Sequence, residues 1–184
     1  MRAIDFDKGD FLKYENKIFQ VIDIKHTHLG RGSANLTLIL KNIQTGQRIE
    51  KVFKPDEDLE YLEVEKRKVV YIGKSDKAFL FKNEAKKYEL KRSSFNYLEK
   101  YLKDNLEVVG YFDEDDDLIF VELPKIVEYK VTFAEPGFKG NTVQGSYKKI
   151  IIETGFEFKA PFFIKEGDII RINTETGEYV ERVL

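Results

Sequence analysis

The chain has 184 residues with 31 basic and 33 acidic side chains, and its net charge of −2 excludes a protein that is basic throughout. The absence of cysteine excludes disulfides, thiolate metal sites and thiol nucleophiles, and only two histidines are present. No uncharged run is long enough for a membrane helix, and acids stand where a signal peptide would be apolar. We therefore expect a cytoplasmic protein with no membrane partner.

Short alternating runs in residues 1–64 predict β-strands rather than helices. The expected strands are residues 17–25, 35–41 and 47–54. Leu36, Leu38 and Leu40 alternate with other side chains, which predicts that the three leucines share one face of a strand. Residues 24–49 contain four basic side chains and no acid, which predicts a positive end on this part of the chain.

The connection between the first two of these strands has the sequence His28-Leu29-Gly30-Arg31-Gly32-Ser33. Glycine on both sides of Arg31 permits positive φ angles and removes bulk, which predicts an exposed arginine at a hairpin tip. Such an arginine can contact phosphate or stack on a base, and the alternative is a flexible turn with a solvated side chain. His26 and His28 have no nearby acid or cysteine in the sequence to complete a metal site, so no metal is expected.

Residues 65–126 predict a second set of strands and one helix. The expected strands are residues 68–72, 78–82, a short run around 88, 106–112 and 118–123. Phe95, Leu98 and Leu102 have helical spacing, which predicts an α-helix from about Ser94 to Lys103 with Ser93 or Ser94 as its cap.

Five consecutive acids, Asp113 to Asp117, lie between the last two of these strands. They lack the ligand pattern and the glycine of a calcium-binding loop, so a solvated hairpin turn is expected. An alternative is a carbohydrate-active enzyme that uses acids such as Asp115 and Asp117. The sequence contains no nucleophile elbow, Walker loop or dinucleotide fingerprint, so we do not expect an enzyme.

The last part of the chain predicts a third set of strands. They are expected at residues 126–133, 147–153, 155–159, 168–172 and 178–183. The loop at residues 136–145 contains three glycines together with amide and hydroxyl groups. Its free backbone donors suit contact with RNA or phosphate, and the alternative is simply a long connection.

These three sets of strands predict an all-β protein of three modules, residues 1–64, 65–126 and 127–184. Modules of only about sixty residues need closed barrels, because open sheets of that size leave costly edges. The middle module fits an OB fold with a helix after its third strand, and the last module fits an OB fold without that helix. The first module has no helix and fits a small SH3-like barrel.

Motifs along the whole chain carry a resemblance to a known family. In the first module they are Gly30-Arg31-Gly32, Leu40-Lys41-Asn42, Thr45-Gly46 and Glu50-Lys51-Val52-Phe53. In the third they include Glu135-Pro136-Gly137-Phe138-Lys139-Gly140-Asn141-Thr142, Ala160-Pro161-Phe162-Phe163-Ile164 and Thr176-Gly177-Glu178-Tyr179-Val180. With these motifs in this order and spacing, the chain resembles bacterial elongation factor P.

The resemblance implies an SH3-like (KOW-type) N-terminal domain followed by two OB-fold domains in an L shape. It implies a monomeric translation elongation factor, not an enzyme, that binds the 70S ribosome between the peptidyl and exit tRNA sites. Its partners would be peptidyl-tRNA and ribosomal RNA, and it would stimulate peptide-bond formation at consecutive prolines by positioning the peptidyl-tRNA. No cofactor and no metal are implied.

The resemblance also assigns roles to particular residues. Arg31 matches the tip residue that reaches toward the acceptor end of the peptidyl-tRNA. The residues that would support this tip are His28, Leu29, Gly30, Gly32 and Ser33. The residues that match contacts with the small subunit, mRNA and tRNA are Lys139, Gly140, Asn141, Thr142, Tyr179 and Arg182.

Several positions depart from the common family pattern, and two of them, Arg31 and Asn141, concern the predicted contacts. Arg31 stands where many members carry a modified lysine, which excludes a lysyl-type modification. In an arginine-bearing branch this residue is rhamnosylated, so Arg31 is expected either bare or modified by an arginine glycosyltransferase. Asn141 replaces the usual aspartate. The alternative function is a generic single-stranded RNA-binding OB protein, which would bind free RNA through exposed aromatic rings.

Overall fold

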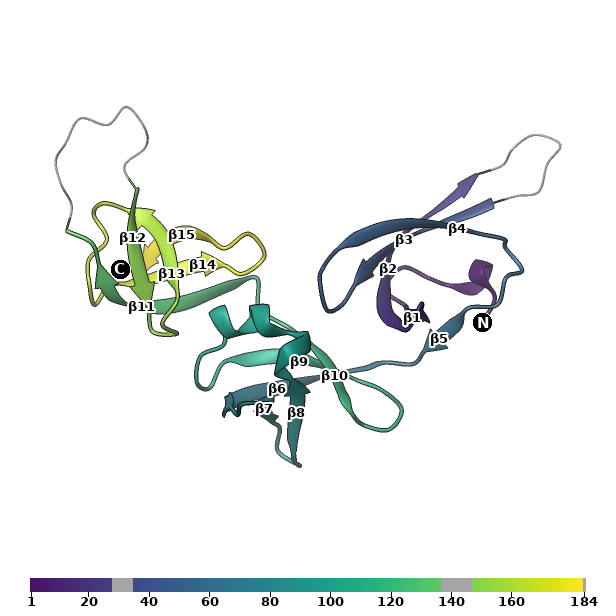
Figure 1. Cartoon of the computed structure of the whole chain (residues 1–184), viewed down its shortest axis with the longest axis horizontal. Coiled ribbons are helices and arrows are strands. Elements are labelled where there is room, and N and C mark those ends of the chain that lie inside the picture. Colours follow the sequence, from purple (N-terminus) through teal and green to yellow (C-terminus); the bar gives the residue numbers. More distant parts are fainter. Residues whose placement is uncertain (28–34, 137–146, 184) are drawn as a thin grey trace. The chain divides into compact units, whose positions relative to one another are not determined.

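A computed structural model describes residues 1–27, 35–136 and 147–183 (Figure 1). Over these residues the chain forms three five-stranded sheets, and its helical turns are short 3₁₀ segments. The predicted all-β class is confirmed. Within the described ranges, no helix is long and apolar enough to cross a membrane.

The first sheet has the strand order β4-β3-β2-β1-β5 and antiparallel neighbours. Its elements are the 3₁₀ turn η1 (Ala3–Asp5), β1 (Phe11–Tyr14), β2 (Lys17–Thr27), β3 (Asn35–Asn42), β4 (Arg48–Phe53) and β5 (Glu60–Leu62). Leu36, Leu38 and Leu40 are at most 1% exposed and lie in one core, which confirms the face predicted from their alternation. Glu15 and Asn16 both have positive φ angles, which match the tight β1–β2 turn to the twist of its strands.

The second sheet has the order β10-β9-β6-β7-β8. Its strands are β6 (Glu65–Lys74), β7 (Ala78–Lys82), β8 (Lys87–Lys91), β9 (Glu107–Phe112) and β10 (Leu118–Glu122). The third sheet has the order β13-β12-β11-β14-β15. Its strands are β11 (Ile126–Ala134), β12 (Tyr147–Ile152), β13 (Glu157–Pro161), β14 (Ile169–Asn173) and β15 (Glu178–Val183). Numbered from its own first strand, the second sheet reads 5-4-1-2-3, and the third sheet reads the same when followed from β15 to β13. This is the OB arrangement.

The chain divides into two compact units. One contains Met1–Arg67 and Gly110–Phe120, and the other contains Lys68–Val109 and Val121–Leu184. Since the middle sheet contributes strands to both units, we keep the division into modules 1–64, 65–126 and 127–184 as a proposal.

The prediction of an α-helix from about Ser94 to Lys103 is wrong. The segment forms two 3₁₀ turns, η2 (Arg92–Ser94) and η3 (Asn96–Lys100), and neither has a side-chain cap. Phe95 separates them because its φ of −136° is not helical. Phe95 and Leu98 are both buried, and their spacing of three residues matches the period of a 3₁₀ turn as well as an α-helix.

The η3 turn is fixed by an ion cluster on one side and by core packing on the other. Glu99 accepts hydrogen bonds from Lys74 Nζ and from both Nη2 and Nε of Arg92, at 2.7 and 3.3 Å for the arginine. Directly after η3, Tyr101 is 8% exposed and belongs to the core of the third sheet together with Tyr129 and Phe158. The middle module therefore contributes a core side chain to the third sheet.

The Glu99 cluster predicts a loss of stability in acid. Hydrogen bonds from Lys74 and then from Arg92 hold the pKa of Glu99 below its ordinary value of 4.5. A carboxylate whose pKa is lower in the folded than in the unfolded chain stabilises the fold at pH above about 4.5, and this stabilisation is lost as the pH falls through the folded pKa. We expect Glu99→Gln to lower the free energy of unfolding by about 1 kcal/mol at pH 7, since solvent partly screens the cluster, and by less below pH 4.

Urea unfolding of the two proteins between pH 3 and 7 measures this difference. Glu181→Gln is the control, because Glu181 is an exposed carboxylate paired with Arg171 and should change stability little. A Glu99→Gln variant that loses the same stability at every pH would contradict the assignment.

Candidate functional site

The predicted arginine tip lies on the connection between β2 and β3. These strands pair from Phe19↔Asn42 to Thr27↔Asn35, and residues 28–34 join them. Arg31 and the predicted supporting residues His28, Leu29, Gly30, Gly32 and Ser33 therefore lie outside the described residues. Their roles stay predictions.

The stem of this hairpin is anchored on one face and charged on the other. The leucines of β3 anchor it in the first core. On the exposed face, Lys25 Nζ lies 3.1 Å from Glu50 Oε1 of β4. The acid-free window seen in the sequence is therefore partly neutralised by an acid that lies one residue beyond it. Lys41 and Arg48 are exposed and stand opposite each other in the β3–β4 ladder, so the stem keeps positive charge.

The carboxylate alternative finds no support in the described residues, and His28 of the metal alternative lies outside them. Among the described residues no group of three or more histidine, aspartate or glutamate side chains is placed to hold a metal ion. Asp113 Oδ1 accepts the backbone N–H groups of Asp115 and Asp117 at 3.1 and 2.9 Å, and Asp116 has a φ of 63°. The acidic run is thus a hairpin turn with exposed Asp115 and Asp117.

The second predicted contact loop joins β11 to β12. Lys139, Gly140, Asn141 and Thr142 lie outside the described residues. The strands that carry this loop are held together at Glu135, whose carbonyl oxygen accepts a hydrogen bond from Lys148 Nζ at 2.9 Å. The backbone N–H of Glu135 also donates to the carbonyl of Lys149 at 3.1 Å.

Tyr179 and Arg182, the two predicted contact residues that the structure describes, share one face of β15. Their spacing of three residues would put them on opposite faces of a regular strand. The β14–β15 register shifts between Arg171 and Ile172, so that Tyr179 stands opposite Ile172 and Arg182 opposite Ile170. This bulge brings both side chains to the face of the two buried isoleucines.

The neighbours of Arg182 and Tyr179 determine the charge that this face presents. Arg182 Nη1 lies 3.7 Å from Asp168 Oδ2, and the guanidinium stands over the ring of Phe163, 5.6 Å from its centroid. Burial raises the pKa of the Tyr179 hydroxyl, and the charge of Arg182 acts in the opposite direction. Tyr179 therefore remains a neutral hydrogen-bonding group at physiological pH.

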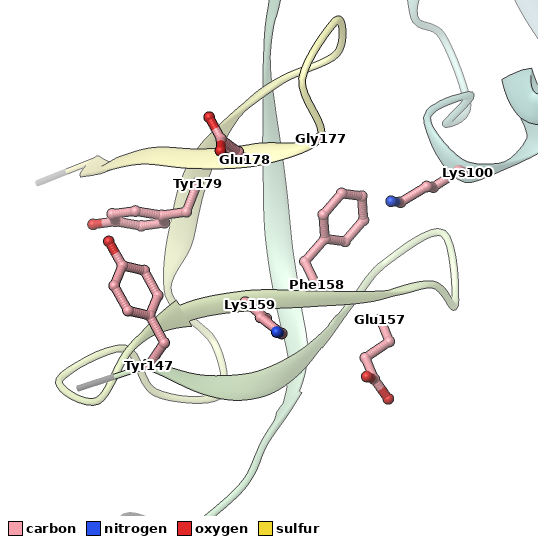
Figure 2. Close-up of a pocket in the computed structure, with 8 residues that line it drawn as sticks. All are labelled: Lys100, Tyr147, Glu157, Phe158, Lys159, Gly177, Glu178 and Tyr179. Carbon is pink, nitrogen blue, oxygen red and sulfur yellow. The ribbon is translucent and has the colours of Figure 1, made fainter. Parts of the chain in front are cut away.

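Tyr179 also lines a pocket of about 550 Å³ between the edge strands β13 and β15 (Figure 2). The lining residues are Lys100, Tyr147, Glu157, Phe158, Lys159, Gly177, Glu178 and Tyr179. Figure 2 shows the Tyr147 and Tyr179 rings at one end and Lys100 pointing at Phe158 at the other. Lys100 Nζ lies 4.2 Å from the Phe158 ring centroid. Aromatic rings beside ammonium groups suit the binding of a flat or anionic group, and this lining contains no serine, histidine or cysteine to act as a nucleophile or imidazole base.

Comparison with known proteins decides the family. A protein named "Elongation factor P" from Acetivibrio thermocellus is 38% identical over 183 residues, which are 98% of this chain and 98% of that protein. The chain belongs to the elongation factor P family. Two family models match the chain. The model "Elongation factor P (EF-P) KOW-like domain" matches residues 2–59, and the model "Elongation factor P, C-terminal" matches residues 127–182. The expected KOW-type first domain and the resemblance itself are confirmed.

A second relative agrees with this family. "Elongation factor P" from Caldicellulosiruptor saccharolyticus is 37% identical over the full length of both chains. Among solved structures, "Eukaryotic translation initiation factor 5A from Methanococcus jannaschii" covers 67% of this chain and 91% of its own, at 14% identity and a TM-score of 0.49. A likeness at this level supports no argument about function.

Among the lining residues that the sequence analysis missed are two lysines. Lys100 comes from the middle module, and Lys159 lies on β13. No motif connects either of them with Tyr179. Lys100 lies beside the third sheet because the adjacent Tyr101 is buried in its core and Thr154 Oγ1 donates a hydrogen bond to the Lys100 carbonyl.

Proposed function

We propose that the protein is a translation elongation factor that binds the ribosome between the peptidyl and exit tRNA sites and speeds peptide-bond formation at consecutive prolines. The observation that carries this proposal is the 38% identity to a protein named elongation factor P over 98% of both chains. The two family matches, near both ends of the chain, extend that support to the first and third modules.

In this proposal the factor contributes no catalytic group. It braces the peptidyl-tRNA, which lowers the entropic part of the barrier to peptide-bond formation. Each tenfold gain in rate requires only about 1.4 kcal/mol, which a few good contacts can supply. Arg31, bare or rhamnosylated by an arginine glycosyltransferase, makes the contact with the acceptor end, and its partners are the 70S ribosome, peptidyl-tRNA and ribosomal RNA.

The third module is proposed to contact the small subunit, mRNA and tRNA through Lys139, Gly140, Asn141, Thr142, Tyr179 and Arg182. The shared face of Tyr179 and Arg182 supports this assignment, because a single RNA or protein surface can touch both side chains. The protein acts as a monomer in the cytoplasm.

The test is the rate of Pro-Pro-Pro peptide synthesis in a reconstituted bacterial translation system. We expect protein purified from its own cells to raise this rate at least about tenfold, and the mass of the peptide containing Arg31 to show whether the residue is modified. A peptide without consecutive prolines is the control and should form at an unchanged rate. If native protein neither binds ribosomes nor changes the rate, the generic RNA-binding alternative replaces this proposal.

A further inference from the structure

A row of lysines covers the outer face of the β7–β8 hairpin. Residues 77–91 contain five lysines and two glutamates, in a chain whose net charge is −2. In β7 and β8 the apolar side chains Phe79, Phe81, Tyr88 and Leu90 are buried, while Lys82, Lys87 and Lys91 are exposed. The hairpin is therefore apolar on its core face. The charged residues on the opposite face of the two strands are Lys82, Lys87 and Lys91, together with one acid, Glu89.

The strand register places two of these lysines directly opposite each other. Lys82 pairs with Lys87 in the antiparallel β7–β8 ladder. Like charges at facing positions destabilise a sheet, because their side chains leave the same face only about 5 Å apart. Over the described residues, no carboxylate lies within ion-pair distance of Lys77, Lys82, Lys87 or Lys91. Glu89 is exposed on the same face as Lys87 and Lys91 but forms no ion pair with them.

The third sheet shows how the same problem is relieved elsewhere in this chain. Lys149 and Lys159 also face each other, across β12 and β13. There Lys149 Nζ lies 3.3 Å from Glu157 Oε1, so the pair is partly neutralised. The neighbouring cations Lys74 and Arg92 of the middle module are likewise engaged by Glu99. The unrelieved Lys82–Lys87 pair thus keeps a charge that a purely structural hairpin would not need.

The position of the hairpin indicates what these charges bind. β7 and β8 are the second and third strands of an OB arrangement, and this face binds oligonucleotides in OB folds. Every aromatic ring of the two strands is buried, so the face offers no ring on which an unpaired base can stack. Lysines without stacking rings suit the phosphate backbone of a folded RNA rather than its bases.

We propose that the lysine surface formed by Lys82, Lys87 and Lys91 binds the phosphate backbone of ribosomal RNA. The inference rests on the proposed function, because it takes the ribosome as the partner, and it adds a contact made by the middle module. From Lys87 to Lys91 the row extends about 13 Å along the strand, which is enough for more than one phosphate.

The experiment compares two triple variants that remove the same charge. Lys82→Gln/Lys87→Gln/Lys91→Gln removes the lysine surface. The control, Lys13→Gln/Lys68→Gln/Lys125→Gln, removes exposed lysines that already pair with Glu60, Glu107 and Glu175. Binding of each full-length protein to vacant 70S ribosomes, without tRNA, is measured between 50 and 200 mM salt.

We expect the surface variant to bind at least about tenfold more weakly than the control at the lower salt, and to show a salt slope smaller by about 2 to 3, since each lost phosphate contact removes 0.7 to 0.9. Its melting temperature should equal or exceed that of the wild type, because the Lys82–Lys87 repulsion is gone. Weakening of the surface variant alone, with stability kept, supports the proposal.

Other results overturn it in distinguishable ways. If wild type and both variants bind equally and show the same salt slope, the assignment of RNA binding to the lysine surface is wrong, while the proposed function stands. A loss seen only when peptidyl-tRNA is present would assign the surface to tRNA and refute ribosomal RNA as its partner. A wild-type protein that fails to bind ribosomes would overturn both proposals.

Discussion

Replacing Arg31 by alanine is expected to reduce Pro-Pro-Pro synthesis to the rate measured without the factor. Arginine is a permanent cation with five donors in a fixed fork, and alanine offers neither charge nor donor to an RNA acceptor end. The expected loss is therefore the whole acceleration, about tenfold or more. Since the sequence places Arg31 in a connection and not in a core, the melting temperature should stay that of the wild type.

The conservative variant Arg31→Lys separates charge from geometry. Lysine keeps the positive charge but loses the bidentate fork, so an intermediate rate is expected. Rates are measured with native and variant proteins at saturating concentration, where weaker ribosome binding no longer limits them. An alanine variant that keeps most of the acceleration would rule out a tip mechanism, whatever the state of modification of Arg31.

Replacing Tyr101 by alanine is expected to lower the free energy of unfolding by about 3 to 5 kcal/mol, the usual range for a large buried ring. Tyr101 is 8% exposed in the core of the third sheet, and its ring centroid lies 6.1 Å from that of Phe158. Its carbonyl oxygen accepts a hydrogen bond from the Tyr129 hydroxyl at 2.7 Å. Nearby, Thr154 Oγ1 donates to the carbonyl of Lys100 at 3.0 Å. Loss of the ring opens a cavity at this joint.

The control for this prediction is Phe133→Ala. Phe133 belongs to β11 of the same sheet but is 46% exposed, so its loss should cost about 1 kcal/mol or less. Tyr101→Phe keeps the ring and should fold nearly as well as the wild type, which makes the test informative even if the alanine variant does not fold. Urea unfolding followed by circular dichroism measures all three. Equal losses for Tyr101→Ala and Phe133→Ala would show that Tyr101 does not connect the middle module to the third core.

Strand positions could be predicted from the sequence because the period of two is a local property. The alternation at Leu36, Leu38 and Leu40 identified a core face that the structure confirms. The helix prediction failed for a related reason. Phe95 and Leu98 are spaced as both an α-helix and a 3₁₀ turn require. The non-helical φ of Phe95 and the hydrogen bonds between residues three apart, such as Leu98 N–H to Phe95 O, distinguish the two.

For the candidate site too, the sequence predicted some features and not others. Motifs alone pointed to Arg31, to Lys139–Thr142 and to the pair Tyr179 and Arg182. The motifs did not show that the last two share a face, because the β14–β15 bulge that brings them together depends on register with a distant strand. The pocket beside Tyr179 could not be predicted either, since Lys100 reaches it through tertiary contacts, the burial of Tyr101 and the hydrogen bond from Thr154.

The sequence by itself determined the all-β class, the approximate positions of most strands and the family, because alternation and motif spacing are properties of the order of residues in the chain. Tertiary structure alone decided which charges stand together. Lys25 is neutralised by Glu50 across a ladder, whereas Lys82 faces Lys87 without a carboxylate partner among the described residues. The physical reason is that electrostatic interaction depends on distance in space, and strand register sets that distance for residues that lie apart in the sequence.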